Sequence, residues 1–153
     1  SCGAVIWGGA YDPYLADLRA VAHLPVVGPG EASLFVARLI GSRLTILTSE
    51  TGAAGVNAML TRVQLKPDTV VARPMKTTVR KILANISEAH RVIRETAAAA
   101  IREDNADVLM LGSMTQGTLG IAPALRTELG VPVLDPLVIA IQAAEQVAGA
   151  RGM

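Results

Sequence analysis

The sequence predicts an α/β protein made of two pseudosymmetric halves, whose parallel sheets face each other across a cleft. Three observations support this prediction: short apolar runs end in small or turn residues, helical patterns separate them, and part of the chain repeats. The first half is expected to lack its N-terminal strands, because the repeat leaves no sequence for them.

Six apolar runs are predicted to be strands. They are rich in Val, Ile and Leu, without the strict alternation of a strand that is buried on one face only. Such runs are typical of parallel sheets covered on both faces. The predicted strands span residues 4–8, 25–28, 43–48, 68–72, 107–112 and 131–135.

Helical patterns occupy the segments between these strands. Asp12 before Pro13 and Ser87 before an acidic residue are typical N-caps, and Gly41 and Gly130 are typical ends. Proline disfavours both helix and central strand, so the chain around residue 67 and residues 74–78 are predicted loops. The predicted helices span residues 13–21, 31–40, 51–64, about 87–105, 121–129 and 136–148.

The internal repeat relates a strand and its flanking helices. Residues 25–29, PVVGP, recur as PVLDP at 132–136, each residue 107 positions later. Residues 4–9 align with 108–113 at an offset of 104, so Gly9 and Ser113 hold equivalent positions. Parallel α/β units bind ligands at the carboxyl ends of their strands. The loops that open at Gly9 and Ser113 are therefore expected to line one cleft.

The repeat also divides the chain. Two strand–helix units precede the strand at 107, whereas nothing equivalent precedes Ala4. We therefore expect a partial first α/β domain at residues 1–42 and a second α/β domain at 43–135, with the helix at 136–150 packing back on the first domain. About 60 residues would complete the first half. This predicts either a missing N-terminal segment or a homo-oligomer, and an exposed apolar flank beside Ala4.

Composition narrows the class of partner. The chain is 51% hydrophobic and 18% charged, and its 14 basic and 13 acidic residues are spread along it, which disfavours nucleic acid and membrane surfaces as partners. No apolar stretch approaches the roughly 20 residues of a membrane span. With one cysteine, Cys2, and no signal peptide, a cytoplasmic location is expected. The sequence thus favours a small-molecule ligand.

No motif for a cofactor or a metal is found. Ser33 occupies the place of the third glycine after Gly28 and Gly30, so this loop is not a dinucleotide fingerprint. His23 and His90 have no metal-binding spacing to each other or to the cysteine. No cofactor and no metal are expected.

Five segments together resemble a known family. Residues 4–13, 25–33, 44–48, 107–114 and 130–135 resemble, in order and spacing, the hydantoin racemase branch of the aspartate/glutamate/hydantoin racemase superfamily. The resemblance implies two flavodoxin-like halves that close over the substrate. It also implies cofactor-independent isomerisation at an acidic α-carbon beside a carboxylate or imide, as in an amino acid or a hydantoin. In that family one cysteine from each half faces this carbon, one removing the proton while the other delivers one.

The two positions that match these cysteines are Gly9 and Ser113. Glycine carries no proton and would widen the cleft, and a serine hydroxyl is a far weaker acid than a thiol. Superfamily members that decarboxylate malonates also have glycine at the first position, but they keep a cysteine at the second. Three readings follow: a racemase-type isomerase, a decarboxylase or lyase, and a catalytically degenerate small-molecule-binding protein. Whether the chain is an enzyme stays open.

Other loop residues are candidates for holding the substrate. Thr48 and Ser49 follow a strand and precede a helix, where hydroxyls and free N–H groups can bind a carboxylate or imide oxygen. The alternative is that Ser49 or Thr51 only caps that helix. Ser113 is the candidate catalytic or ligand-orienting hydroxyl, and its alternative role is to end the strand and cap the next turn. Met114 and Thr115 follow it in the loop that grips the ligand in the family. Asp12 is the last candidate, with helix capping as its alternative role.

Overall fold

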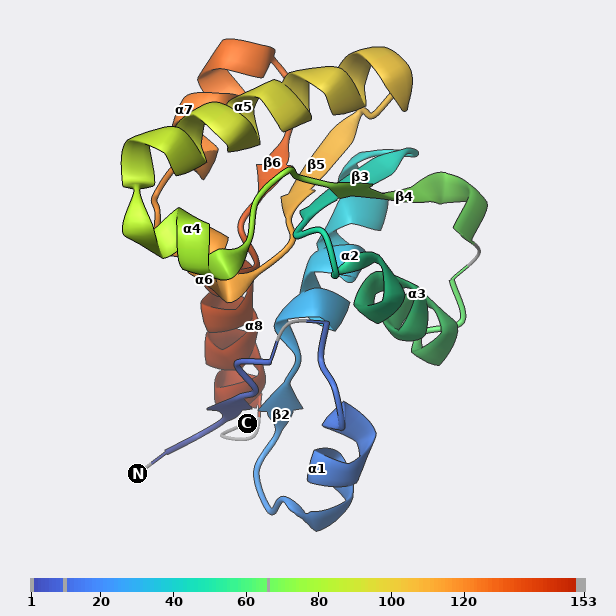
Figure 1. Cartoon of the computed structure of the whole chain (residues 1–153). Coiled ribbons are helices and arrows are strands. Elements are labelled where there is room, and N and C mark those ends of the chain that lie inside the picture. The colour runs from blue at the N-terminus through green and yellow to red at the C-terminus, as the bar shows by residue number, and fades with distance from the viewer. Residues whose placement is uncertain (1, 10, 66, 151–153) are drawn as a thin grey trace.

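The computed structural model describes residues 2–9, 11–65 and 67–150 and contains two parallel sheets. Four strands form the larger sheet in the order β4-β3-β5-β6, and two form the smaller sheet, β1-β2 (Figure 1). The α/β class predicted from the sequence is confirmed. The strands are β1 Val5–Ile6, β2 Val26–Val27, β3 Leu44–Thr48, β4 Val70–Pro74, β5 Val108–Leu111 and β6 Val133–Leu134.

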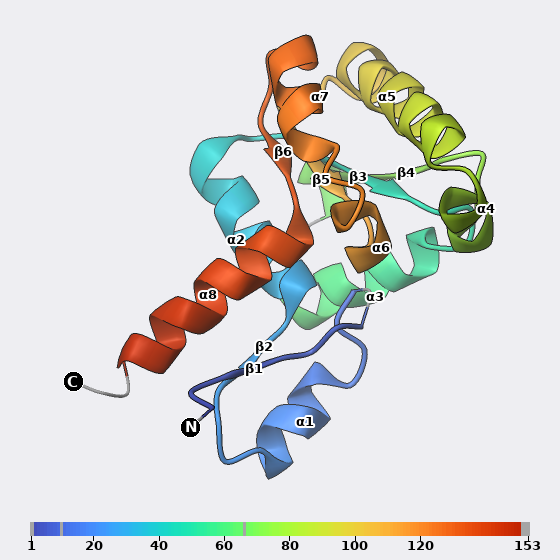
Figure 2. The same ribbon diagram turned by 90° about the vertical axis from the view of Figure 1, so that its left-hand side faces the viewer.

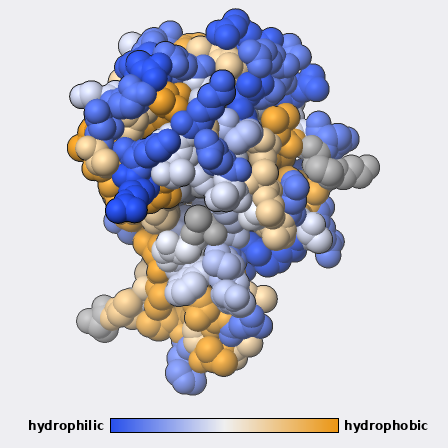
Figure 3. Space-filling model, in the orientation of Figure 1, coloured by the Kyte–Doolittle hydropathy of each residue, from blue (hydrophilic) through white to orange (hydrophobic). Residues whose placement is uncertain are grey.

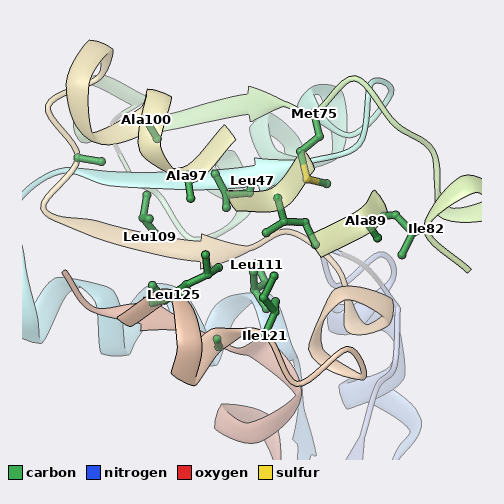
Figure 4. Packing of buried hydrophobic residues seen from close by; sticks show 14 residues of the cluster. Leu47, Met75, Ile82, Ala89, Ala97, Ala100, Leu109, Leu111, Ile121 and Leu125 are labelled. Atoms are coloured by element: carbon green, nitrogen blue, oxygen red, sulfur yellow. The ribbon is translucent and has the colours of Figure 1, made fainter. Parts of the chain in front are cut away.

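Helices cover both faces of the larger sheet. One hydrophobic core lies between this sheet and helices α4, α5 and α7, and the other lies between it and α2, α3 and α8 (Figure 2). Figure 4 shows the first core, where Leu109 and Leu111 of β5 meet Ala97 and Ala100 of α5. The helices are α1 Leu15–Val21, α2 Pro29–Ile40, α3 Ala53–Arg62, α4 Val79–Ala84, α5 Ile86–Glu103, α6 Met114–Gly117, α7 Ala122–Leu129 and α8 Pro136–Ala150, with a 3-10 turn at Pro67–Thr69.

Local side-chain bonds explain where the helix prediction was wrong. α5 begins after Asn85, whose side chain accepts the N–H of Glu88 at 3.0 Å, so Ser87 is not its N-cap. The same Asn85 ends α4, a helix that the sequence did not predict. α1 begins only at Leu15, after Tyr14 in the left-handed region at φ 60°. Asp12 therefore does not cap α1.

The repeat reappears in the pairing of the strands. Val5 pairs with Val26 in the smaller sheet, and Leu109 pairs with Val133 in the larger one. The offsets of these pairs, 104 and 107, are those of the sequence repeat. A side-chain bond recurs as well. Nε of Arg19 donates to the carbonyl of Val26 at 3.1 Å, and Nε of Arg126 donates to that of Val133 at 2.9 Å. The repeat is thus one of structure as well as sequence.

Helices α2 and α8 cross between the two sheets. α2 follows β2 and contacts β5, whereas α8 follows β6 and contacts β1 and β2. The two helices also pack against each other (Figure 2). Because each helix contacts the sheet of the other half, the division of the chain near residues 42 and 135 stays a prediction.

The smaller sheet is the less covered of the two. Val5 of β1 is 42% exposed and Val21 of α1 is 76% exposed. Figure 3 shows hydrophobic surface over the lobe that holds this sheet, on the face in view. In the part of the chain that the structure describes, no helix is long and apolar enough to cross a membrane.

Candidate functional site

Gly9 and Ser113 line one small pocket, at the carboxyl ends of β1 and β5. Pro29 and Pro136, the first residues of α2 and α8, line it too, so both halves contribute equivalent positions. The free volume is about 10 Å³, which is room for roughly one water molecule. A ligand larger than a water molecule therefore does not fit the pocket in this conformation.

Ser113 has two roles in this geometry. Its hydroxyl oxygen accepts the N–H of Gln116 at 3.2 Å and caps α6. The side chain is half-buried and faces the pocket. Its hydroxyl proton has no acceptor among the described residues, so it can be donated to a ligand. The cap fixes the oxygen and leaves the proton for binding.

Gly9 does not widen the pocket as the sequence suggested. A β-carbon at this position would lie 2.9 Å from the indole nitrogen of Trp7 and 3.0 Å from Cδ of Pro13. That indole donates a hydrogen bond of 2.7 Å to the carbonyl of Pro13. The space that a cysteine side chain would need is therefore filled by Trp7 and Pro13.

Tyr11 is a pocket residue that sequence reasoning missed. Its phenol oxygen lies 2.5 Å from the Thr48 hydroxyl, and its backbone is in the left-handed region at φ 59°. The ring packs on α3, where a β-carbon at Gly55 would lie 2.5 Å from it. Burial raises the pKa of the Tyr11 phenol, so it is neutral and can act as a hydrogen-bond donor near pH 7. The sequence signal for this ring was the pair of glycines at the start of α3, Gly52 and Gly55, because a side chain at either position would collide with Tyr11.

Thr48 and Ser49 lie behind this tyrosine. Thr48 is fully buried and outside the pocket lining, and its hydroxyl bonds to Tyr11 and lies 3.3 Å from the carbonyl of Ser49. Ser49 is half-buried, and its carbonyl accepts the N–H of Gly52 at 2.9 Å. Gly52 is the N-cap of α3 and no side chain caps it. The alternative role of Ser49 as a helix cap is therefore absent from the structure.

Asp12 caps α2 across the first loop. Its side chain is completely buried, and its two oxygens accept the N–H groups of Gly30 at 3.0 Å and Glu31 at 2.6 Å. Burial raises the pKa of this carboxyl, while the two N–H bonds and the charge of Arg62 oppose the shift. Asp12 is not among the residues that line the pocket. Its observed contacts are structural.

The second half caps its helix differently. Asp135, directly before α8, accepts the N–H of Leu137 at 2.9 Å. Gly28 occupies the equivalent place before α2, and a β-carbon there would lie 2.6 Å from an oxygen of Asp12. Gly28 has no side chain with which to cap α2, so Asp12 caps this helix from the preceding loop.

The loop after Ser113 contains a half-buried hydroxyl, that of Thr115, and a buried amide, that of Gln116. Met114 lines the pocket, whereas Thr115 is half-buried and outside the lining. Gln116 is 1% exposed; its amide accepts the N–H of Gly112 at 2.9 Å and donates to the carbonyl of Leu47 at 3.1 Å. It therefore ties the end of β5 to the end of β3. The Ser-x-x-Gln spacing of a capping box was its signal.

The pocket contains hydroxyls and no thiol among the described residues. Cys2 is exposed and donates to the carbonyl of Ala4 at 3.0 Å, outside the pocket lining. Across residues 2–9, 11–65 and 67–150, no group of three His, Cys, Asp or Glu is placed to hold a metal. Among the described residues that line the pocket, Ser113 and Tyr11 are those with polar side chains.

Comparison with known proteins identifies relatives of this fold. The sequence model of the Asp/Glu/Hydantoin racemase family matches residues 1–144. A hydantoin racemase of Pseudomonas sp. (strain NS671) is 28% identical over 148 residues, which are 92% of this chain and 55% of that protein. The chain thus spans about half the length of this curated relative.

Two solved structures extend the comparison. Allantoin racemase from Pseudomonas fluorescens superposes with a TM-score of 0.84 at 27% identity, covering 97% of this chain and 63% of that one. Arylmalonate decarboxylase superposes with a TM-score of 0.64 at 17% identity, covering 95% of this chain and 68% of that one. The second similarity is one of fold alone.

Proposed function

Because the chain belongs to the Asp/Glu/hydantoin racemase family, we propose that it acts without a cofactor or metal at an acidic α-carbon beside a carboxylate or a cyclic imide. The observation that carries the proposal is the shared pocket: Gly9 and Ser113, equivalent positions in the repeat, line it together. This arrangement favours a reaction in which groups from both halves approach one carbon.

In this proposal two hydroxyls bind the reacting group. Solvent water or hydroxide takes up the α-proton, because no carboxylate, imidazole or thiol lines the pocket among the described residues. The Ser113 hydroxyl and the Tyr11 phenol donate hydrogen bonds to the enolate oxygen that this step leaves. Thr48 supports Tyr11 through the bond of 2.5 Å between their oxygens. Neither hydroxyl has a pKa near neutrality, so proton transfer is slow and racemisation by the chain as it stands is weak.

The other candidate residues enter when the loops open. We assign Met114 to the wall beside the ligand, and Ser49 and Thr115 to loop positions that reach a carboxylate or imide oxygen only after opening. Asp12 holds the loop by capping α2. The physiological assembly in this proposal is either a homo-oligomer or a protein with a further N-terminal segment, and its location is the cytoplasm.

The test is deuterium exchange at the α-carbon of hydantoins and amino acids, with CO2 release from arylmalonates measured in parallel. Exchange above the buffer rate supports the proposal, and CO2 release would instead favour a decarboxylase. Exchange should fall at least about tenfold in Ser113→Ala and in Tyr11→Phe. The matched control is Tyr14→Phe, because Tyr14 is 74% exposed and outside the pocket. Equal exchange in all three variants would refute the roles given to the two hydroxyls.

Restoring thiols provides a second test. Gly9→Cys and Ser113→Cys together should raise α-proton exchange, because thiols titrate closer to neutral pH and inversion needs one group on each face. Ser113→Cys should fold readily, whereas Gly9→Cys requires Trp7 and Pro13 to shift. A folded double variant without any gain, which still binds a hydantoin, would favour the degenerate binding protein, the reading suggested by a pocket without thiols.

A further inference from the structure

Two grooves lie along the open edges of β2 and β6, and the repeat relates them. The first has a volume of about 500 Å³ and the second about 640 Å³. Most residues that line the second groove lie 107 positions after a residue that lines the first. The C-terminal part of α8 closes the first groove, and the C-terminal part of α2 closes the second. The grooves are therefore two versions of one surface, and each is a control for the other.

An arginine stands in each groove at equivalent positions. Arg19 and Arg126 each donate Nε to a carbonyl of the neighbouring edge strand, at 3.1 Å and 2.9 Å. In the first groove the two Nη atoms of Arg19 also bind the carboxylate of Glu31, at 3.0–3.2 Å. The guanidinium of the first groove is thus fully used within the chain.

The second groove lacks this carboxylate. Val138 occupies the place of Glu31, and it is 44% exposed. The Nη atoms of Arg126 have no hydrogen bond or ion pair within the described ranges. Because Nε is held by the strand, the outer edge of a planar guanidinium is fixed and open, which suits bidentate binding of a carboxylate.

The remaining walls of the second groove are mainly apolar. One other charged group is present, Asp135, and its carboxylate holds the N–H of Leu137 at the start of α8. Gln142 adds one amide. The apolar lining residues are Val36, Ile40, Val131, Pro132, Val133, Leu134, Val138 and Ile139.

We propose that this groove, which we call the Arg126 groove, binds a small monocarboxylate with an apolar body, such as a medium-chain fatty acid. The open guanidinium would hold the carboxylate and the valine and isoleucine walls would bury the body. The volume of about 640 Å³ lies within the range of small-molecule sites. An added peptide strand fits less well, because Arg126 occupies the carbonyl of Val133 at the strand edge.

This site is separate from the pocket of the proposed reaction. No described residue lines both. Substitutions in the Arg126 groove therefore alter no residue that lines the pocket, and binding there can be measured whether or not the chain catalyses α-proton exchange.

The test is titration calorimetry with octanoate on the whole chain and on two reciprocal variants. Val138→Glu installs the carboxylate of the first groove and should weaken octanoate binding at least about tenfold, because Arg126 then has an internal partner. Glu31→Val frees Arg19 and should raise the stoichiometry from one site to two. Arg126→Gln should also abolish binding, and circular dichroism checks that each variant is folded.

Three results would overturn the proposal. The first is no octanoate binding to the parent chain, and the second is equal binding to parent and Val138→Glu. The third is equal binding of neutral octanol and octanoate, which would mean that apolar contact alone is responsible. Sedimentation of the same samples separates a different occupant: dimerisation that Val138→Glu abolishes, without octanoate binding, would assign the groove to a second copy of the chain.

Discussion

Replacing Asp12 by alanine tests whether this carboxylate holds the fold or the ligand. The change removes both acceptors at the start of α2 and leaves the N–H groups of Gly30 and Glu31 without their partner. Hydrogen bonds to a charged group contribute about 1.5–3 kcal/mol each. Relief from burying the charge offsets part of this loss, because burial raises the pKa of the Asp12 carboxyl. The expected net loss is about 2–4 kcal/mol.

The measurement is urea unfolding followed by circular dichroism. In a thermal melt of the same samples, a loss of this size lowers the melting temperature by roughly 5–15 °C for a chain of this length. Asp17→Ala is the matched control, since Asp17 is exposed and lies in the first turn of α1, and it should change stability by less than about 0.5 kcal/mol. Unchanged stability in Asp12→Ala, together with a loss of hydantoin binding or exchange, would show that the carboxylate serves the ligand and that the capping argument is wrong.

Three further predictions concern bonds away from Asp12. Gln116→Leu should lower the free energy of unfolding by about 1–3 kcal/mol, because the bonds of its amide to Gly112 and Leu47 are lost and only the direct backbone bond between those two residues remains; a urea midpoint equal to the parent's would contradict this. The Arg73 guanidinium holds the pKa of the Asp104 carboxyl below its ordinary value of 3.8, so this pair stabilises the fold above that pH and the contribution is lost as the pH falls below it. Asp104→Asn should therefore flatten the acid side of a stability profile measured by urea midpoints, and an unaltered slope would exclude the pair as its cause. In an absorbance titration of Tyr14→Phe, the remaining tyrosine, Tyr11, should ionise above the ordinary pKa of 10.0, whereas ionisation at or below it would mean that the phenol is not buried.

The sequence predicted the sheets well because parallel strands leave a strong local signal. Apolar runs such as Leu44–Thr48 and Val108–Leu111 were located to within a residue or two. The offsets of the repeat also anticipated the register of both strand pairs. These properties depend on neighbours in the chain or on the comparison of one segment with another, so they can be read without a structure.

The parts that were missed depend on contacts between distant segments. Asp12 was assigned to the helix that follows it, but it caps a helix 17 residues further on, because Gly28 offers no side chain there. Tyr11 became a pocket residue only through its packing on α3 and its bond to Thr48, 37 positions away. Placing Gly9 and Ser113 in one pocket needed only the repeat, whereas the groups that supply chemistry beside them needed tertiary structure.

The crossing of α2 and α8 has a consequence for ligand entry. Both helices begin at the pocket, with Pro29 and Pro136, and each continues onto the sheet of the opposite half. A movement that separates the Gly9 loop from the Ser113 loop therefore also displaces the starts of two helices that pack against each other. Ser33 of α2 and Ala140 of α8, equivalent in the repeat, are both fully buried small residues. Opening of the pocket to a ligand is therefore coupled to the packing of two helices, of which only the first turns line the pocket.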